Sequence, residues 1–361
     1  MALFSPRRQQ SGGPGVTDFL SVDDVSRIFG PNLSLGERIA ARLGGKVETR
    51  SVRAVSDVSL SVRKGETLGL VGESGCGKST LGRVIAGILP PTTGRVAIDG
   101  APVMENGTKV TTRVQTVFQD PFASLDPRMK VGDTVSEGPI AHGLTTRGGA
   151  RAYVAQWFER VGLDPVWVDR YPHQFSGGQR QRIAIARALA MQPDVLICDE
   201  PVASLDVSIQ AQIINLFLEL TRDLGLTSVF ISHDLSVVQH VSDRVAVMYL
   251  GRIVELGPVA QVFGTPAHPY TAALFGSVPK LVLDADELVR FNAIDGEVPS
   301  PLAPPSGCYY HPRCPLATRT CRETQPRTQP VSDLRAVACH HFDAHLKARS
   351  SDAQAGRAVK T

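Results

Sequence analysis

Short apolar runs alternate with longer stretches of helical spacing along the middle of the chain. The runs Thr67–Val71, Val195–Cys198 and Ser228–Ile231 are predominantly apolar, which is typical of parallel strands buried on both faces. Helical periodicity lies between the last two runs, through Ser208–Leu224. This alternation of strand and helix predicts an α/β fold built on a parallel sheet.

Two further patterns surround these runs. Apolar and polar residues alternate from Val55 to Val62, which predicts a half-exposed strand. We expect ordered structure to begin at residues 19–22, further strands at residues 95–100 and 114–118, and a closing hairpin from residues 245–249 and 253–257. Residues 121–191 instead show helical periodicity, with helices expected at 131–142, 151–162 and 178–191. They predict a helical subdomain inserted into the sheet.

The ends of the chain and one internal stretch fall outside these patterns. Residues 1–17 and 346–361 hold little apolar surface, so we expect flexible tails there. The stretch between Phe29 and Val52 has the pattern of a short basic amphipathic helix around Leu35–Leu43, and no role follows from it. After Pro279 the composition shifts towards Pro and Cys. We therefore expect one large domain over residues 18–278 and a small Cys-rich module over residues 279–345.

Composition narrows the class of protein. A chain of 361 residues with 42% hydrophobic residues suits a large globular domain with a small appendage. A net charge of +3, with basic residues spread among acidic ones, argues against nucleic acid as a partner. No apolar run approaches the ~18 residues of a membrane helix, and the N-terminus has no apolar signal core. We expect a cytosolic protein that meets a membrane only through a protein partner.

A phosphate-binding loop follows the first buried strand. Residues Gly72–Thr80 fit G-x-x-x-x-G-K-[ST], and helical spacing follows from Leu81 to Leu89. Glycines let backbone N–H groups turn towards a phosphate at a helix N-terminus, where the helix dipole favours an anion. Lys78 is expected to reach the β- and γ-phosphates, and Ser79 to hold Mg²⁺. The residues predicted to bind ATP are Gly72, Glu73, Ser74, Gly75, Cys76, Gly77, Lys78, Ser79 and Thr80.

Two carboxylates follow the buried strand that ends at Cys198. Asp199 is expected at the carboxyl edge of the sheet, beside the phosphate loop, where it can hold Mg²⁺ through water. Glu200 then comes within reach of a water in line with the γ-phosphate, and it is the candidate general base. Adjacent acids after a strand are often only a solvated turn, and the lysine loop upstream favours the catalytic interpretation.

A second anion-binding motif, Gln174–Arg182, precedes a predicted helix. Two such motifs on different subdomains of one chain cannot serve a single nucleotide, so a second subunit is implied. The segment resembles the signature motif of ATP-binding cassette (ABC) ATPases, with Phe175 where the family commonly has Leu. The resemblance spans residues 18–278. Gln119 resembles the family's Q-loop residue, Asp206 its D-loop aspartate and His233 its switch histidine.

The resemblance implies a P-loop (RecA-like) ATPase core with antiparallel β elements and a helical signature subdomain. It also implies a head-to-tail dimer, in which the signature residues of one subunit act on the ATP bound by the other. The implied roles are Mg²⁺ binding by Ser79, Gln119 and Asp199, catalysis by Lys78, Gln119, Glu200 and His233, and signature contacts by Ser176, Gly177, Gly178 and Gln179. Phe29 is the nearest aromatic candidate for stacking on adenine.

Four of the six cysteines lie near the C-terminus with the spacing C-x₅-C-x₆-C-x₁₇-C. These four, Cys308, Cys314, Cys321 and Cys339, are a ligand set for a [4Fe–4S] cluster or a tetrahedral Zn²⁺ ion, and the spacing does not choose between them. Four free buried thiols are the plainer alternative. Cys76 and Cys198 are expected to be small core residues.

This tail resembles that of the ATPase subunits of bacterial oligopeptide and dipeptide importers, which carry an iron–sulfur cluster at these cysteines. The resemblance implies a peripheral ATPase on the cytoplasmic face of the inner membrane that powers peptide import. Its implied partners are a paralogous ATPase subunit or a second copy of this chain, two transmembrane permease subunits and, indirectly, an extracytoplasmic solute-binding protein. Import of nickel, opines, glutathione or another small solute stays open. So does a non-transport ABC ATPase, although a single cassette without heptad repeats disfavours it.

Overall fold

The computed structural model describes residues 18–30, 51–120, 124–277 and 294–346. The tail expected at residues 1–17, nearly all of the tail at 346–361 and the amphipathic helix expected around Leu35–Leu43 lie outside these residues.

The centre of the molecule is an eight-stranded sheet. Its strands are β3 (Thr67–Val71), β8 (Val114–Val117), β9 (Val195–Asp199), β10 (Thr227–Ile231), β11 (Arg244–Tyr249), β12 (Arg252–Pro258), β13 (Gln329–Ser332) and β14 (Arg335–Val337). They lie in the order β13-β14-β12-β11-β3-β10-β9-β8. The five strands from β11 to β8 are parallel, and β3, β9, β10 and β11 are buried at every residue, as their apolar sequences predict.

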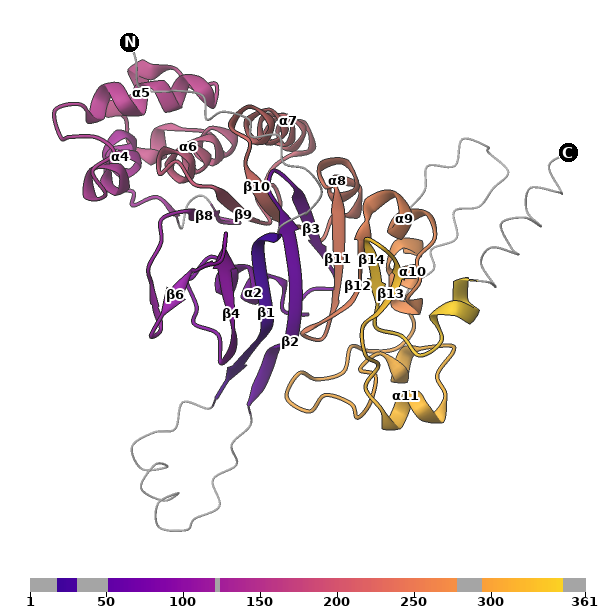
Figure 1. The fold of residues 1–361 in the computed structure, drawn as a ribbon. Helices are drawn as coiled ribbons and strands as arrows, with labels where there is room; N and C mark the ends of the chain where they lie inside the picture. Colours follow the sequence, from indigo (N-terminus) through magenta and orange to yellow (C-terminus); the bar gives the residue numbers. More distant parts are fainter. Residues whose placement is uncertain (1–17, 31–50, 121–123, 278–293, 347–361) are drawn as a thin grey trace, which may run out of the picture.

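A second, antiparallel sheet has the strand order β2-β1-β4-β5. In β2 (Val52–Arg63), Val58 and Leu60 are buried whereas Asp57 and Ser59 are exposed. This alternation confirms the predicted half-exposed strand. Helix α2 (Lys78–Ile85) packs between the two sheets (Figure 1). The strands are β1 (Asp18–Phe29), β2 (Val52–Arg63), β4 (Thr93–Ile98) and β5 (Ala101–Pro102), and a separate hairpin joins β6 (Met104–Glu105) to β7 (Thr108–Lys109).

Helices cover the opposite face of the main sheet. Strand residues alternate between two cores: Ile197 faces α2, whereas Leu196 and Cys198 face the helices. Three helices form the predicted helical subdomain at one end of the molecule (Figure 1). They are α4 (Val131–Ala141), α5 (Ala150–Arg160) and α6 (Gly177–Ala190). The 3₁₀ turns η1 (Pro165–Asp169) and η2 (Pro172–Gln174) lie between α5 and α6. The other helices are α7 (Val207–Leu224), α8 (Leu235–Val241), α9 (Val259–Gly264) and α10 (Pro269–Gly276).

The C-terminal segment, residues 294–346, is continuous with the main sheet. Strand β14 pairs with β12 through Glu255 and Val337, so the hairpin of β11 and β12 is confirmed but does not close the sheet. Before these strands the segment forms the turn η3 (His311–Arg313) and the short helix α11 (Arg319–Glu323).

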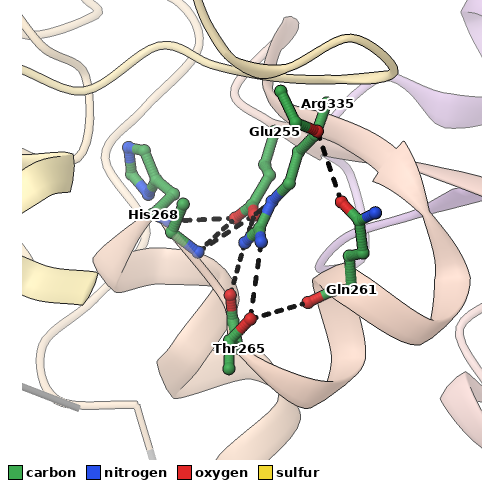
Figure 2. Close-up of polar contacts among 7 residues, drawn as sticks. Glu255, Gln261, Thr265, His268 and Arg335 are labelled. Carbon is green, nitrogen blue, oxygen red and sulfur yellow. Dashed lines mark hydrogen bonds and ion pairs between the residues drawn. The ribbon is translucent and has the colours of Figure 1, made fainter. Parts of the chain in front are cut away.

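A buried ion pair fastens this segment to the rest of the molecule (Figure 2). Arg335 Nη2 on β14 lies 2.6 Å from Glu255 Oε1 on β12, and Arg335 also donates to the carbonyl oxygen of Thr265. The Glu255 carboxylate accepts the backbone N–H groups of Ala267 and His268 just before α10, His268 at 2.9 Å. Because both charged groups are almost fully buried, each depends on these partners.

Candidate functional site

The phosphate-binding loop connects β3 to α2, as its sequence predicts. A side-chain carbon at Gly77 would meet the carbonyl oxygen of Ala54, and one at Gly72 would meet that of Met248, so only glycine fits at these two positions. Gly77 also has φ of 107°, in the left-handed region. The buried Lys78 turns back over the loop, and its Nζ donates to the carbonyl oxygens of Gly72 at 2.8 Å and Glu73 at 3.0 Å.

A hydrogen bond between two side chains links the start of α2 to the end of β9. Ser79 Oγ donates to Asp199 Oδ1 at 2.8 Å, so two of the three groups predicted to hold Mg²⁺ lie together although they are far apart in the sequence. Burial raises the pKa of the Asp199 carboxyl above its ordinary value, and the hydrogen bond from Ser79 works in the opposite direction. Hydroxyl and carboxylate oxygens are the donors that a hard cation such as Mg²⁺ prefers, so this pair fits the ion.

Glu200 stands at the centre of a second polar group. Its Oε2 accepts from Gln119 Nε2 at 3.1 Å and lies 3.3 Å from His233 Nδ1. The backbone of Glu200 is in the left-handed region, with φ of 48°, and its N–H donates to the carbonyl oxygen of Ile231. This conformation is uncommon for a residue other than glycine, and it turns the chain sharply where β9 ends. The structure therefore brings Gln119, Glu200 and His233 together.

An open depression lies over the loop. It is lined by the loop residues from Ser74 to Thr80, by Gln119 and Glu200, and by Phe29, whose ring is 36% exposed. The guanidinium of Arg27 lies 4.7 Å from the centre of that ring. The signature residues 176–179 of this chain do not line the depression.

The signature residues begin helix α6. Ser176 and Gln179 form a reciprocal cap: Gln179 N–H donates to Ser176 Oγ, and Ser176 N–H donates to Gln179 Oε1. Phe175 is buried against Trp167, with ring centres 5.8 Å apart, so an aromatic residue is well accommodated at this position. Asp206 occupies the residue before α7 without a side-chain cap.

Comparison with known proteins decides the family. Residues 55–203 match the family described as ABC transporter, and residues 254–321 match the oligopeptide/dipeptide transporter C-terminal region. The chain is 48% identical to the dipeptide transport ATP-binding protein DppF of Haemophilus influenzae, covering 81% of this chain and 90% of the relative. It is also 48% identical to the oligopeptide transport ATP-binding protein AppF of Bacillus subtilis, covering 90% and 97%. The chain belongs to the ABC transporter family.

Solved ABC structures share the fold. One is the ATP-binding cassette MJ0796, a dimer in a post-hydrolysis state bound to ADP and phosphate, with a TM-score of 0.56 and 26% identity. The match covers 66% of this chain and 98% of that one. The predicted ABC ATPase fold is confirmed. No helix in the described parts of the chain combines the length and apolar character needed to span a membrane.

The four C-terminal cysteines of this ABC protein lie near one another. Burial, together with the charges of Cys308, Cys314 and Cys321, raises the pKa of the Cys339 thiol to about 12, although the hydrogen bond from the His341 N–H lowers it. Burial likewise raises the pKa of Cys308 to about 11. However, across the described ranges no group of three or more His, Cys, Asp or Glu side chains is placed to hold a metal ion. The arrangement therefore does not support the expected [4Fe–4S] cluster, nor the alternative zinc ion. Cys76 and Cys198 are buried core residues, as predicted.

The C-terminal segment makes two contacts with the site that the sequence does not predict. Pro301 lines the depression over the phosphate loop, and the Arg313 guanidinium pairs with the Glu73 carboxylate inside that loop. Arg313 and Glu73 are 240 positions apart, and no local pattern marks either residue as the other's partner.

Proposed function

We propose that this chain is the ATP-hydrolysing subunit of an importer of dipeptides or oligopeptides. The observation that carries the proposal is the set of linked side chains beside the phosphate loop, in which Ser79 meets Asp199 and Glu200 meets both Gln119 and His233. The names of the relatives support the peptide as cargo, because they are dipeptide and oligopeptide transport proteins matched over most of their length. Related small solutes lack such support.

Each side chain has a role that follows from its position. Lys78 pairs with the terminal phosphates of ATP, and the loop N–H groups bind their oxygens. Ser79, Gln119 and Asp199 would hold Mg²⁺, which would supply positive charge to neutralise the phosphates. Glu200 accepts a proton from the attacking water. His233 orients the Glu200 carboxylate, since its Nδ1 lies 3.3 Å from Oε2. Phe29 stacks on adenine at the rim of the depression.

The partners follow from the same arrangement. The signature residues of this chain do not line its own depression, which supports a dimer in which Ser176, Gly177, Gly178 and Gln179 meet the ATP of the other subunit. Asp206 then lies near the dimer contact. We propose a paralogous ATPase or a second copy as that subunit, and two permease subunits that hold the pair on the cytoplasmic face of the membrane. An extracytoplasmic binding protein delivers the peptide.

Uptake by cells tests this proposal. In cells that lack the chain, the wild type should restore uptake of a labelled dipeptide or oligopeptide. Lys78→Ala should not restore it, because the loop loses its positive partner for the phosphates. Restored uptake of labelled nickel or glutathione, with no peptide uptake, would contradict the proposed cargo but not the ATPase. Equal peptide uptake with Lys78→Ala would contradict the ATPase.

We further propose that residues 18–278 carry the nucleotide chemistry, while Cys308, Cys314, Cys321 and Cys339 in residues 279–345 bind one [4Fe–4S] cluster, with zinc as the alternative. The number and spacing of the four cysteines support the proposal, as does the Cys339 sulfur, which accepts the His341 N–H at 3.4 Å. The cluster would tie the segment together rather than take part in hydrolysis, because phosphoryl transfer needs no electron transfer.

Metal analysis of protein purified without oxygen decides the ligand. We expect iron and sulfide in stoichiometric amounts with a visible absorption band, both lost in Cys321→Ser, and ATP hydrolysis that survives this substitution. Cys198→Ser is the matched control, because this cysteine lies in β9 away from the C-terminal segment. Stoichiometric zinc without iron would establish the alternative, and no metal at all would refute both.

A further inference from the structure

Glu73, in the phosphate loop, forms hydrogen bonds through both its backbone and its side chain. Its N–H donates to Tyr270 Oη at 3.0 Å, and its carbonyl oxygen accepts from Lys78 Nζ at 3.0 Å. Its carboxylate faces the two terminal nitrogens of Arg313, Nη1 at 2.8 Å from Oε2 and Nη2 at 3.0 Å from Oε1. Both polar groups of its backbone and both oxygens of its side chain are therefore held at once.

Arg313 is itself held rigidly. Its side chain is only 3% exposed, and its Nε donates to the carbonyl oxygen of Asp295 at 3.1 Å. The guanidinium lies 5.9 Å from the ring centre of Tyr249, at the end of β11. A bidentate contact fixes both the distance and the orientation of a carboxylate, which a single charge on a flexible chain does not.

Three buried tyrosines pack next to the contact between Arg313 and Glu73. Tyr249, Tyr270 and Tyr310 pack in pairs with ring centres 4.6 to 5.3 Å apart. Tyr310 precedes η3, which carries Arg313, and Tyr270 belongs to α10. The same cluster therefore positions both groups that hold Glu73, the Tyr270 hydroxyl and the Arg313 guanidinium.

We infer that Arg313 is a positioning residue of the nucleotide site, which presets the phosphate loop through Glu73. Gly72, Gly75 and Gly77 leave the loop conformationally free, and ordering it upon ATP binding would reduce the affinity. A Glu73 residue held on all sides removes much of that freedom beforehand. The inference rests on the proposed ATP-binding function, and it assigns the C-terminal segment a direct part in nucleotide affinity.

ATP affinity and turnover separate this role from simple attachment of the segment. In the full chain, Arg313→Met and Glu73→Gln should each weaken binding of a fluorescent ATP analogue by about tenfold. The double variant should bind the analogue no more weakly than either single variant, because each single substitution already removes the same contact between Arg313 and Glu73. In the assembled transporter the KM for ATP should rise, while kcat at saturating ATP stays within about twofold. Arg313→Lys keeps the positive charge but loses the pair of terminal nitrogens. Its ATP affinity should lie between those of the wild type and Arg313→Met.

The matched control is Arg319→Met. Arg319 lies in the same segment and pairs with Glu323 at 2.7 Å, but both side chains are exposed, so ATP affinity should not change. Unchanged ATP affinity in folded Glu73→Gln would overturn the inference, as would effects of the two single variants that add in the double variant. If Arg313→Met does not fold, Glu73→Gln still decides, because it leaves the contacts of Arg313 with Asp295 and Tyr249 in place. A wild-type chain that binds no ATP would instead refute the proposed function.

Discussion

Replacing Glu200 by Gln should leave ATP bound and reduce its hydrolysis by about 10² to 10⁴-fold. An amide has the shape of the carboxylate, and its oxygen can still accept from Gln119 Nε2, which lies 3.1 Å from Glu200 Oε2. It cannot accept the proton of the attacking water. The loss should therefore fall on the chemical step and not on the binding of nucleotide.

Two measurements on the assembled transporter check this expectation. Single-turnover hydrolysis should show the loss for Glu200→Gln, while the affinity for ATP stays near that of the wild type. Lys78→Ala is the contrasting variant, because it should lose affinity for ATP itself. Near-normal turnover by Glu200→Gln would remove Glu200 from the role of general base.

Substitutions in the signature motif should disable the ATP site of the partner subunit. The N–H groups at the start of α6 are fixed donors, and a methyl group at Gly178 would meet the side chain of Ile209 and push these donors out of place. Losing the contact with one such donor typically costs about 10²- to 10³-fold in rate. With a paralogous partner, Gly178→Ala should abolish trapping of nucleotide under the partner's lysine loop. Nucleotide bound under Lys78 of the same chain should remain, because residues 176–179 do not line that depression.

The methyl group in Gly178→Ala acts through the side chain of Ile209, and this contact gives a matched control. The double variant with Ile209→Ala relieves that contact within the subunit and should recover trapping at the partner's site. Photolabelling with a nucleotide analogue assigns each trapped nucleotide to its subunit. Loss of the label from the variant subunit itself would contradict the head-to-tail arrangement.

Local patterns were sufficient to predict the central part of the site. The run Thr67–Val71 matches β3 residue for residue, and the helix expected from Leu81 begins at Lys78 in the structure. Asp199 and Glu200 could be placed near the loop because parallel strands end at one edge of a sheet. Such rules act over a few residues or between neighbouring strands, and they carry no information about longer connections.

The contacts of the C-terminal segment could not be predicted from local patterns. The short helices α8, α9 and α10 were not predicted, because six to eight residues give too little periodicity to identify a helix. Strand β14 has only three residues and gave no strand pattern, so its pairing with β12 was missed. The contact of Arg313 with Glu73 depends on how the sheet, α10 and η3 pack together, which only the folded chain specifies.

The ion pair of Glu255 and Arg335 has a consequence for the synthesis of the chain. The two residues are separated by 80 positions, so the ribosome completes β11, β12 and the cassette motifs well before Arg335 emerges. During that interval β12 has an unpaired edge and Glu255 lacks its cation. A product that ends before Arg335 would keep an isolated carboxylate at a buried position and an open strand edge, two features that expose a chain to degradation and aggregation. The arrival of β14, the last strand in the described residues, thus removes both features at once.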